Sequence, residues 1–464
     1  MSNTNVNPDA PILYDPITNI AYSNQNNAVI EAHNGVTIEG LSLRGEDLSS
    51  FGIRIKDKSN ITIKNIDISG LLLPVADYSN GSGNGGGGAA FDFANFSTQR
   101  PDYYWNHPDQ SVASPQISDR NVAGIEIVNG SASLSVTNIH MENLNVHDTT
   151  GTAVRLNLTA DHNANRIDIW SGIFHNNLNS IVLSATGNSS GIIDIRQNIF
   201  GNEVHISLSN TNVNSANWDV ELDHNQFNNT TLSLYSTNSR TSFNLKQNVL
   251  SETALTILTS NGNGNEIHMT DNSISGNRSK IGIYNAQNTI LTLNNNIFQD
   301  SSNDGLLIIN RNRNSSGSDI STTNNSFINA HGTGLTLYNQ TNATLRLTMT
   351  SDIFTDNGDE GLELDNFSNS HITASLKGLT FQNNTLEAIE AENEGTSAFG
   401  LTLSENIFTN NGGGKSFLGY SSDTGTFTLN QSGNIFTGDD VPDLKFGLQL
   451  DKGLCFGTLA SCTI

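Results

Sequence analysis

A short phrase ending in phenylalanine recurs through most of this chain, and it constrains the fold more than any other feature. The phrase reads Asn-Ile-Phe in its commonest form, has Asn-rich flanks, and is anchored at Phe174, Phe200, Phe227, Phe298, Phe327, Phe354, Phe381, Phe408 and Phe436. Leu250 and Ile274 fill the same slot between Phe227 and Phe298, so successive anchors lie 23 to 29 residues apart. A period in this range indicates a solenoid, in which each repeat packs on its neighbours.

Within each repeat, apolar and polar residues alternate in short runs. Residues 361–365 read Gly-Leu-Glu-Leu-Asp, and residues 334–338 read Gly-Leu-Thr-Leu-Tyr. This is the period of two that is typical of strands, and no sustained period of 3.6 is present that would indicate helices. A leucine-rich repeat, which needs a helical segment in each unit, is therefore a weak alternative, and each coil is predicted to consist of several short strands.

The first coils keep the same rhythm and carry a resemblance to a known superfamily. Residues 36–43 read Val-Thr-Ile-Glu-Gly-Leu-Ser-Leu, and they align with Ile-Thr-Ile-Lys-Asn-Ile-Asp-Ile at 61–68, 25 residues later. These phrases resemble the opening coils of pectate-lyase-like proteins, and the resemblance covers nearly the whole chain. It implies an all-β, right-handed parallel β-helix solenoid with coils of about 23–29 residues, and it implies a fold more than an activity.

Changes in the pattern suggest boundaries within the chain. We expect an N-terminal arm or cap at 1–27, the β-helix at 28–440 with an insertion at 71–121, and a C-terminal cap at 441–464. The two cysteines, Cys455 and Cys462, lie close together in that cap, where a disulfide would close a short loop. Two unpaired thiols in a reducing compartment are the alternative.

Charge excludes one class of partner. The chain has 45 Asp and Glu against 21 Lys and Arg, a net charge of -24, and such a chain repels the phosphate backbone of nucleic acids. No stretch approaches the roughly 18 to 20 apolar residues of a membrane helix, so membrane insertion is not expected.

The polar start at 1–27 has no signal-peptide pattern. We expect an extracellular or bacterial cell-surface protein with no signal peptide in this chain, and Asn at the corners of coils, where it suits tight turns.

Four carboxylates form the first candidate site. Aligning coils on the anchor places Glu363 and Asp365 outward on one coil, and Glu390 and Glu392 outward on the next, with Glu360, Glu387 and Asp304 at the preceding corner. Carboxylates about 5 to 7 Å apart should raise one another's pKa or hold a cation. We predict Ca²⁺ as the natural ligand, and these four residues are also the catalytic candidates. A solvated acidic face is the alternative.

Members of the pectate-lyase family use outward acidic residues for Ca²⁺, and some hydrolases of the family use outward Asp residues as acid and base. The patch resembles both. A lyase also needs a cation to act as base or to neutralise the uronate, and the nearest in sequence are Arg346, Lys377 and Lys415, none of them in the matching strand. The enzymatic interpretation of the patch is therefore incomplete.

The second candidate lies beside the insertion. Arg54, Glu126 and Arg155 occupy equivalent outward positions on three consecutive coils, and Lys56 lies two residues from Arg54. Beneath the aromatic residues of the insertion, this row could grip an acidic sugar, because aromatic faces stack on pyranose rings and Arg pairs with carboxylates. The residues concerned are Tyr103, Tyr104, Trp105 and His107. A plain row of surface ion pairs is the alternative.

Two functions of different classes remain open. The first is a secreted or surface-exposed adhesive solenoid that contacts glycans or host and matrix surfaces; phrases of the form F-x-x-N, at 354–357 and 381–384, resemble those of autotransporter passengers. The second is a polysaccharide lyase or glycoside hydrolase acting on an extracellular polysaccharide. Convergent carboxylates with a cation would favour the enzyme, and a smooth polar face would favour adhesion.

Overall fold

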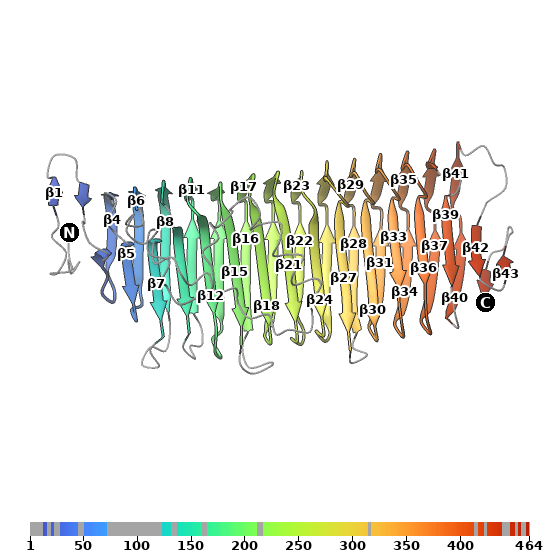
Figure 1. Ribbon diagram of the computed structural model, residues 1–464, viewed down its shortest axis with the longest axis horizontal. Helices are drawn as coiled ribbons and strands as arrows, with labels where there is room; N and C mark the ends of the chain where they lie inside the picture. The colour runs from blue at the N-terminus through green and yellow to red at the C-terminus, as the bar shows by residue number, and fades with distance from the viewer. Residues whose placement is uncertain are drawn as a thin grey trace, which may run out of the picture. The chain divides into compact units, whose positions relative to one another are not determined.

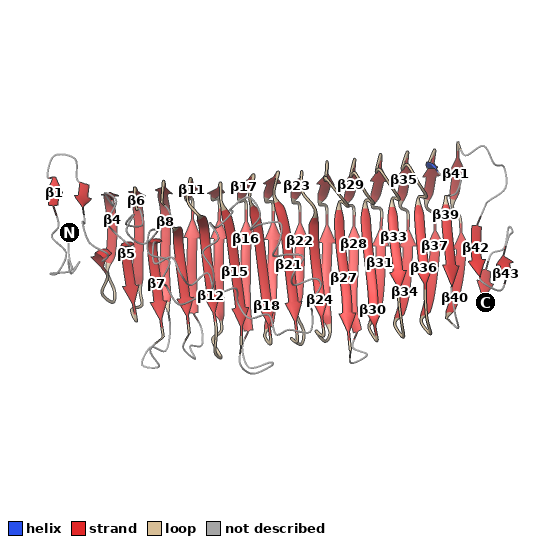
Figure 2. Cartoon of the chain, in the orientation of Figure 1, coloured by secondary structure: helices blue, strands red, loops and turns tan. Residues whose placement is uncertain are grey.

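The structure is a computed structural model, and it describes residues 13–15, 20–22, 28–44, 51–71, 123–130, 137–149, 151–159, 165–210, 217–313, 317–412, 416–421, 425–438, 446–450, 453–455 and 461–463. These residues form strands and turns, with no α-helix among them and one 3₁₀ residue, Gly412 (Figure 2). The predicted all-β solenoid is confirmed. The chain divides into two units, residues 1–237 and 238–464, which are described separately.

The first unit contains two sheets, here named A and B. Sheet A takes one strand from each coil: β3 (Ala28–Glu31), β5 (Phe51–Lys56), β7 (Ala123–Asn129), β9 (Thr152–Leu158), β12 (Asn179–Ala185), β15 (Glu203–Ser209) and β18 (Thr231–Thr237). Sheet B takes β1 (Leu13–Asp15), β2 (Ile20–Tyr22), β4 (Thr37–Arg44), β6 (Ile61–Ser69), β8 (Asn138–His147), β10 (Asn165–Trp170), β11 (Ile173–His175), β13 (Gly191–Arg196), β14 (Ile199–Phe200), β16 (Asn217–Asp223) and β17 (Gln226–Asn228).

The second unit has the same organisation (Figure 1). Its sheet A contains β21 (Ala254–Ser260), β24 (Ser279–Tyr284), β27 (Leu306–Asn312), β30 (Leu335–Thr341), β33 (Leu362–Asn366), β36 (Ile389–Asn393), β39 (Phe417–Ser421), β42 (Phe446–Leu450) and β43 (Gly453–Cys455). The long strands of its sheet B are β19 (Arg240–Lys246), β22 (Glu266–Thr270), β25 (Thr289–Asn294), β28 (Gly317–Thr323), β31 (Thr344–Thr350), β34 (His371–Lys377), β37 (Ala398–Ser404) and β40 (Thr426–Ser432). Its shorter strands are β20 (Val249–Ser251), β23 (Ser273–Ser275), β26 (Ile297–Gln299), β29 (Ser326–Ile328), β32 (Ile353–Thr355), β35 (Thr380–Gln382), β38 (Ile407–Thr409), β41 (Ile435–Thr437) and β44 (Ser461–Thr463).

Successive coils pair in parallel, position by position, so that each residue lies over its counterpart in the repeat. Phe354, for example, pairs with Phe381, and Leu345 pairs with Ile372. Pairing is antiparallel only near the termini of the described chain, between β1 and β2, β40 and β44, and β42 and β43. The predicted caps and domain boundaries stay predictions. Cys455 and Cys462 lie in β43 and β44, but their side chains are outside the described residues, so the disulfide also stays a prediction.

The anchor phenylalanines form a stack inside each unit. In the second unit their ring centroids are 4.8 to 5.2 Å apart, and neighbouring rings are within 8° of parallel. Phe354 is fully buried between the rings of Phe327 and Phe381. Burying a large aromatic side chain in this way stabilises the fold by about 1.5–3 kcal/mol per residue through removal of apolar surface from water.

Buried asparagines form a second kind of internal ladder. Asn310 donates a side-chain hydrogen bond to Asn339 at 2.8 Å, Asn339 donates to Asn366 at 2.9 Å, and Asn366 donates to Asn393 at 2.8 Å. An amide side chain can take part in such a row because it carries both a donor and an acceptor. The ladder fixes the register of the coils, since a slip would leave buried polar groups without partners.

Asparagine also occupies many of the corners. Among the described residues, 28 residues other than glycine have a positive φ, and 14 of these are Asn. Asn tolerates this left-handed conformation better than most residues because its short side chain can hydrogen-bond locally. The structural role predicted for the abundant Asn residues is therefore confirmed.

Candidate functional site

Two neighbouring strands of sheet A in the second unit carry the predicted carboxylates. Glu363 in β33 pairs with Glu390 in β36, and Asp365 pairs with Glu392. The residues between them point into the core: Leu362, Leu364, Ile389 and Ala391 are all fully buried. The alternation of the strands therefore places the four carboxyl side chains on the outward face, where the sequence predicted them.

The preceding coil adds hydroxyl groups to this carboxyl cluster, defined as Glu363, Asp365, Glu390 and Glu392. Thr336 of β30 pairs with Glu363 and donates a hydrogen bond from Oγ1 to Glu363 Oε2 at 3.1 Å. Tyr338 of the same strand pairs with Asp365. The carboxyl cluster is thus bordered on one side by the hydroxyl-bearing residues of β30, which the repeat pattern did not indicate.

Three further carboxylates lie at the corner that precedes these strands. Glu360 accepts a hydrogen bond from Thr333 Oγ1 at 2.8 Å, and Asp304 forms an ion pair with Arg278. Glu387 acts electrostatically on Glu390, and it raises the pKa of that side chain together with Glu360 and Glu363. The corner therefore adds negative charge around the cluster, and the one described arginine there is already paired with Asp304.

Burial and mutual repulsion change the ionisation of the cluster. Asp365 is only 5% exposed, and desolvation, followed by the charges of Glu363 and Glu392, raises its pKa to about 9. Asp365 also hydrogen-bonds with Glu363, whose own pKa is raised by burial. Burial, with repulsion from Glu360 and Glu363, raises the pKa of Glu390 to about 7. At neutral pH the Glu363–Asp365 pair therefore keeps one proton, while the Glu390 carboxyl group is partly protonated and partly ionised.

Asp365 also has unused hydrogen-bonding capacity. Its Oδ1 atom is buried and has no hydrogen-bond partner among the described residues. A buried carboxyl oxygen without a partner is unfavourable by about 1–3 kcal/mol, unless a ligand or water supplies a donor. Carboxyl groups whose environments hold their pKa values apart are the arrangement that acid–base catalysis requires.

The raised pKa values make stability depend on pH. Between the ordinary pKa of 3.8 and about 9, the unfolded chain has lost the proton that folded Asp365 retains. Because the folded state binds more protons in this window, stability falls as pH rises through it. We expect the thermal midpoint to decrease from pH 5 to pH 9, and the Asp365→Asn variant to show a flatter dependence. Asp319→Asn, at an exposed ion pair, is the control and should keep the slope of the parent protein; equal slopes in all three proteins would contradict this reading.

A metal ion is the alternative to a proton at this cluster. Within the described ranges, no group of three or more His, Cys, Asp or Glu side chains is arranged to hold one. Calcium binding stays a prediction, which thermal unfolding with and without added Ca²⁺ would test.

The second candidate site is a row of ion pairs in the first unit. Arg54 Nε lies 3.0 Å from Glu126 Oε2, and Arg155 Nη2 lies 2.7 Å from Glu126 Oε1, so each carboxylate oxygen is within ion-pair distance of an arginine. Glu31 continues the row by pairing with Arg54, while Lys56 is exposed at the edge. The predicted alignment on consecutive coils is confirmed. The row as described is an alternating ion-pair ladder.

The aromatic half of that second site consists of Tyr103, Tyr104, Trp105 and His107, which fall outside the described residues. Their cooperation with Arg54, Lys56, Glu126 and Arg155 in binding a sugar therefore stays a prediction.

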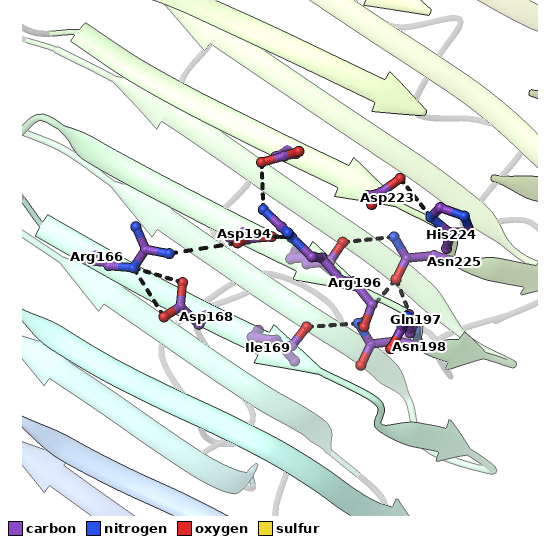
Figure 3. Close-up of polar contacts among 12 residues, drawn as sticks. Arg166, Asp168, Ile169, Asp194, Arg196, Gln197, Asn198, Asp223, His224 and Asn225 are labelled. Atoms are coloured by element: carbon purple, nitrogen blue, oxygen red, sulfur yellow. Dashed lines mark hydrogen bonds and ion pairs between the residues drawn. The ribbon is translucent and has the colours of Figure 1, made fainter. Parts of the chain in front are cut away.

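Sequence reasoning missed a polar network on sheet B of the first unit (Figure 3). Arg166 lies between Asp168, at 3.1 Å, and Asp194, at 3.7 Å, while Arg196 contacts Asp194 and lies 2.9 Å from Glu221. The hydrogen bond that Arg196 donates to Asp194 raises the pKa of Arg196. The signal was available as Arg-x-Asp at 166–168 and Asp-x-Arg at 194–196, because the register pairs Asp168 with Asp194. Each arginine has carboxylate partners, so the network stabilises the sheet.

Comparison with known proteins agrees with the fold. Residues 257–441 match the family model described as "Right handed beta helix region". This segment lies in the second unit and contains the carboxyl cluster. Together with the parallel ladder of strands, the match identifies the fold as a right-handed parallel β-helix, as the sequence predicted.

Several solved structures are similar at low identity. A double mutant of the periplasmic alginate epimerase AlgG is 9% identical, with a TM-score of 0.41, over 91% of this chain and 79% of that chain. Tailspike protein 3 of bacteriophage CBA120 is 11% identical, with a TM-score of 0.27, over 88% of this chain and 57% of that one. PfbA, a surface adhesin of Streptococcus pneumoniae, is 11% identical, with a TM-score of 0.20, over 95% and 89%.

At these identities the likenesses concern the fold alone. No curated protein matches the chain. Where the structure describes the chain, it contains no helix of the length and apolarity that crossing a bilayer demands.

Proposed function

We propose that the protein is a secreted or surface-exposed β-helix that binds an extracellular polysaccharide at the carboxyl cluster and hydrolyses its glycosidic bonds. The observation that carries this proposal is that adjacent coils place Asp365, which keeps its proton at neutral pH, and Glu390, whose pKa is about 7, on the same outward face. A proton donor and a proton acceptor on adjacent coils are the two groups that glycoside hydrolysis needs.

The roles follow from the ionisation states. Asp365 donates its proton to the glycosidic oxygen as the bond to the leaving sugar breaks. Glu390 takes a proton from the water that attacks the anomeric carbon, so that one bond is broken and one formed. The backbone positions of the two residues differ by one coil and two residues along the strand, about 8 Å. This separation resembles the roughly 6.5–9.5 Å between the carboxyl groups of inverting hydrolases. Glu363, which hydrogen-bonds with Asp365, is a positioning residue.

Elimination, the reaction of a lyase, has less support. The cations that the sequence suggested for it lie on sheet B: Arg346 pairs with Asp319 at 3.3 Å, and Lys377 pairs with Glu405 at 3.5 Å. Lys415 falls outside the described residues. Since a lyase needs a base and a group that neutralises the uronate, we favour a hydrolase.

Adhesion without chemistry is the second candidate. It is favoured by the hydrogen bonds that Thr333 and Thr336 donate to Glu360 and Glu363. These bonds give the two carboxyl groups a structural role between neighbouring coils. A face of this kind can bind a glycan, or a host or matrix surface, without cleaving anything.

A panel of polysaccharides separates these functions. The protein is incubated with neutral and acidic plant, algal and animal polysaccharides, with Ca²⁺ or with chelator, and both new reducing ends and unsaturated-sugar absorbance are followed. We expect the protein to release new reducing ends from neutral polysaccharides without any unsaturated-sugar absorbance. Absorbance would identify a lyase, while binding without either signal would leave the adhesive solenoid.

A further inference from the structure

The outward face of sheet B in the second unit carries a regular array of hydroxyl groups. One column runs through five successive strands, from β25 to β37, in continuous parallel register: Thr292, Ser321, Thr348, Ser375 and Thr402. A second column, two residues further along each strand, contains Asn294, Thr323, Thr350, Lys377 and Ser404. We call these ten positions the hydroxyl face, since eight of them are Ser or Thr.

Most of these hydroxyl groups make no side-chain hydrogen bond to the residues that the structure describes. Thr348, Ser375 and Thr402 are exposed. Among the described residues, the only side-chain hydrogen bond within the first column runs from Ser321 to Thr292, at 3.4 Å. Each hydroxyl can donate one hydrogen bond and accept two. The face therefore presents donors and acceptors that an external ligand can use.

The face is nearly uncharged, although the chain as a whole has a net charge of -24. Its one charged member, Lys377, is paired with Glu405 at 3.5 Å. At its border, Asp319 and Arg346 are paired with each other at 3.3 Å. A cationic partner finds no unpaired carboxylate among these described residues, and an anionic polymer is repelled by the protein as a whole. Electrostatics thus favour a neutral partner.

The array is also regular and stiff. Strands in a sheet are about 4.8 Å apart, so five of them repeat the hydroxyl group over about 19 Å. β-branched threonine has few side-chain rotamers, and the backbone of each strand is fixed by the strands on either side. Ordering the face on binding therefore loses little entropy. A partner that itself repeats along an extended chain can use several of these positions at once.

We infer that the hydroxyl face docks an extended, neutral polysaccharide chain. This inference rests on the proposed function, because it names the class of substrate that the carboxyl cluster of the same unit would cleave. A neutral glycan presents the same kind of group, a hydroxyl that donates and accepts, at every sugar. It also brings no charge that must be desolvated against an uncharged face.

Retention on insoluble polysaccharides tests this inference. Microcrystalline cellulose and chitin are used as probes, and the bound fraction is measured against protein concentration. The test variant carries Thr348→Glu and Ser375→Glu in the centre of the face. We expect its affinity to fall by at least about tenfold, because two carboxylates would be desolvated on binding. The control variant, Gln299→Glu with Gln382→Glu, adds the same charge on the neighbouring short strands β26 and β35, and we expect its affinity to change by less than about twofold.

The outcomes distinguish docking from cleavage. Retention of the parent protein that is lost only in the test variant supports the inference, even if no polysaccharide is cleaved. Equal retention of test and control variants overturns it, as does binding to alginate or polygalacturonate gels but not to cellulose or chitin. Adsorption to ice with no retention on either neutral polysaccharide also overturns it. Release of reducing ends from soluble oligosaccharides without retention would leave the proposed function standing and remove the docking face.

Discussion

Replacing Phe354 by alanine is expected to lower the free energy of unfolding by about 3–5 kcal/mol. The ring is fully buried, and it lies between Phe327 and Phe381 with a centroid distance of 4.8 Å to each. Parallel hydrogen bonds hold the coils on both sides in register, so the backbone cannot collapse into the space that the ring leaves. The loss therefore includes the cavity as well as the transfer of apolar surface. Urea denaturation of the parent and the variant measures it.

The neighbouring residue provides the control. Ile353 belongs to the same strand, β32, but points outward and is 41% exposed. Ile353→Ala should lower stability by less than about 1 kcal/mol, as surface substitutions usually do. If the two variants lose equal stability, the stack of phenylalanines is not what holds the coils together.

Replacing Glu390 by glutamine is expected to reduce the release of reducing ends by about 10²–10⁴-fold, the usual contribution of a general base. Glutamine keeps the size and the hydrogen-bonding reach of the side chain, but it cannot take a proton from water. Desolvation and neighbouring carboxylates raise the pKa of Glu390 to about 7, so that the group can both accept a proton and release it again at neutral pH. The rate is measured on the polysaccharide that the panel identifies, with kcat and KM determined separately.

Glu394→Gln is the matched control, because this carboxylate follows β36 on the same coil and is not part of the carboxyl cluster. It should leave the rate unchanged. A loss in kcat for Glu390→Gln alone supports the assignment of a base. A change in KM alone would mean that Glu390 only binds the sugar, and equal losses in both variants would point to general damage.

The fold was predictable from the sequence because a parallel solenoid stacks like residues. The spacing of the anchor phenylalanines gave the coil, and the alternation around Leu362 and Leu364 gave the outward direction of Glu363 and Asp365. Each of these inferences needs only the repeat length and the period of two. The same reasoning placed Arg54, Glu126 and Arg155 on consecutive strands, as the structure has them.

The environment of the carboxyl cluster was less predictable, because it depends on the side chains of adjacent coils, which the repeat pattern does not specify. The sequence predicted outward carboxylates that raise one another's pKa or hold Ca²⁺, with a solvated acidic face as the alternative. It did not predict that Asp365 is only 5% exposed and shares a hydrogen bond with Glu363. Burial depends on the side chains of adjacent coils, and hydrogen bonds such as that from Thr336 depend on rotamers. The ion pairs of Arg166 and Arg196 were missed for a similar reason, since their two strands, β10 and β13, were aligned only through the anchors that follow them.

The pH dependence of reducing-end release from a neutral polysaccharide tests the central claim most directly. If Asp365 must be protonated and Glu390 ionised, kcat/KM should follow a bell-shaped curve, with a lower limb near pH 7 and an upper limb near pH 9. We predict that curve for the parent protein and loss of its lower limb in Glu390→Gln. No release at any pH across the neutral panel, or release with the same pH profile in the variant, would contradict the claim.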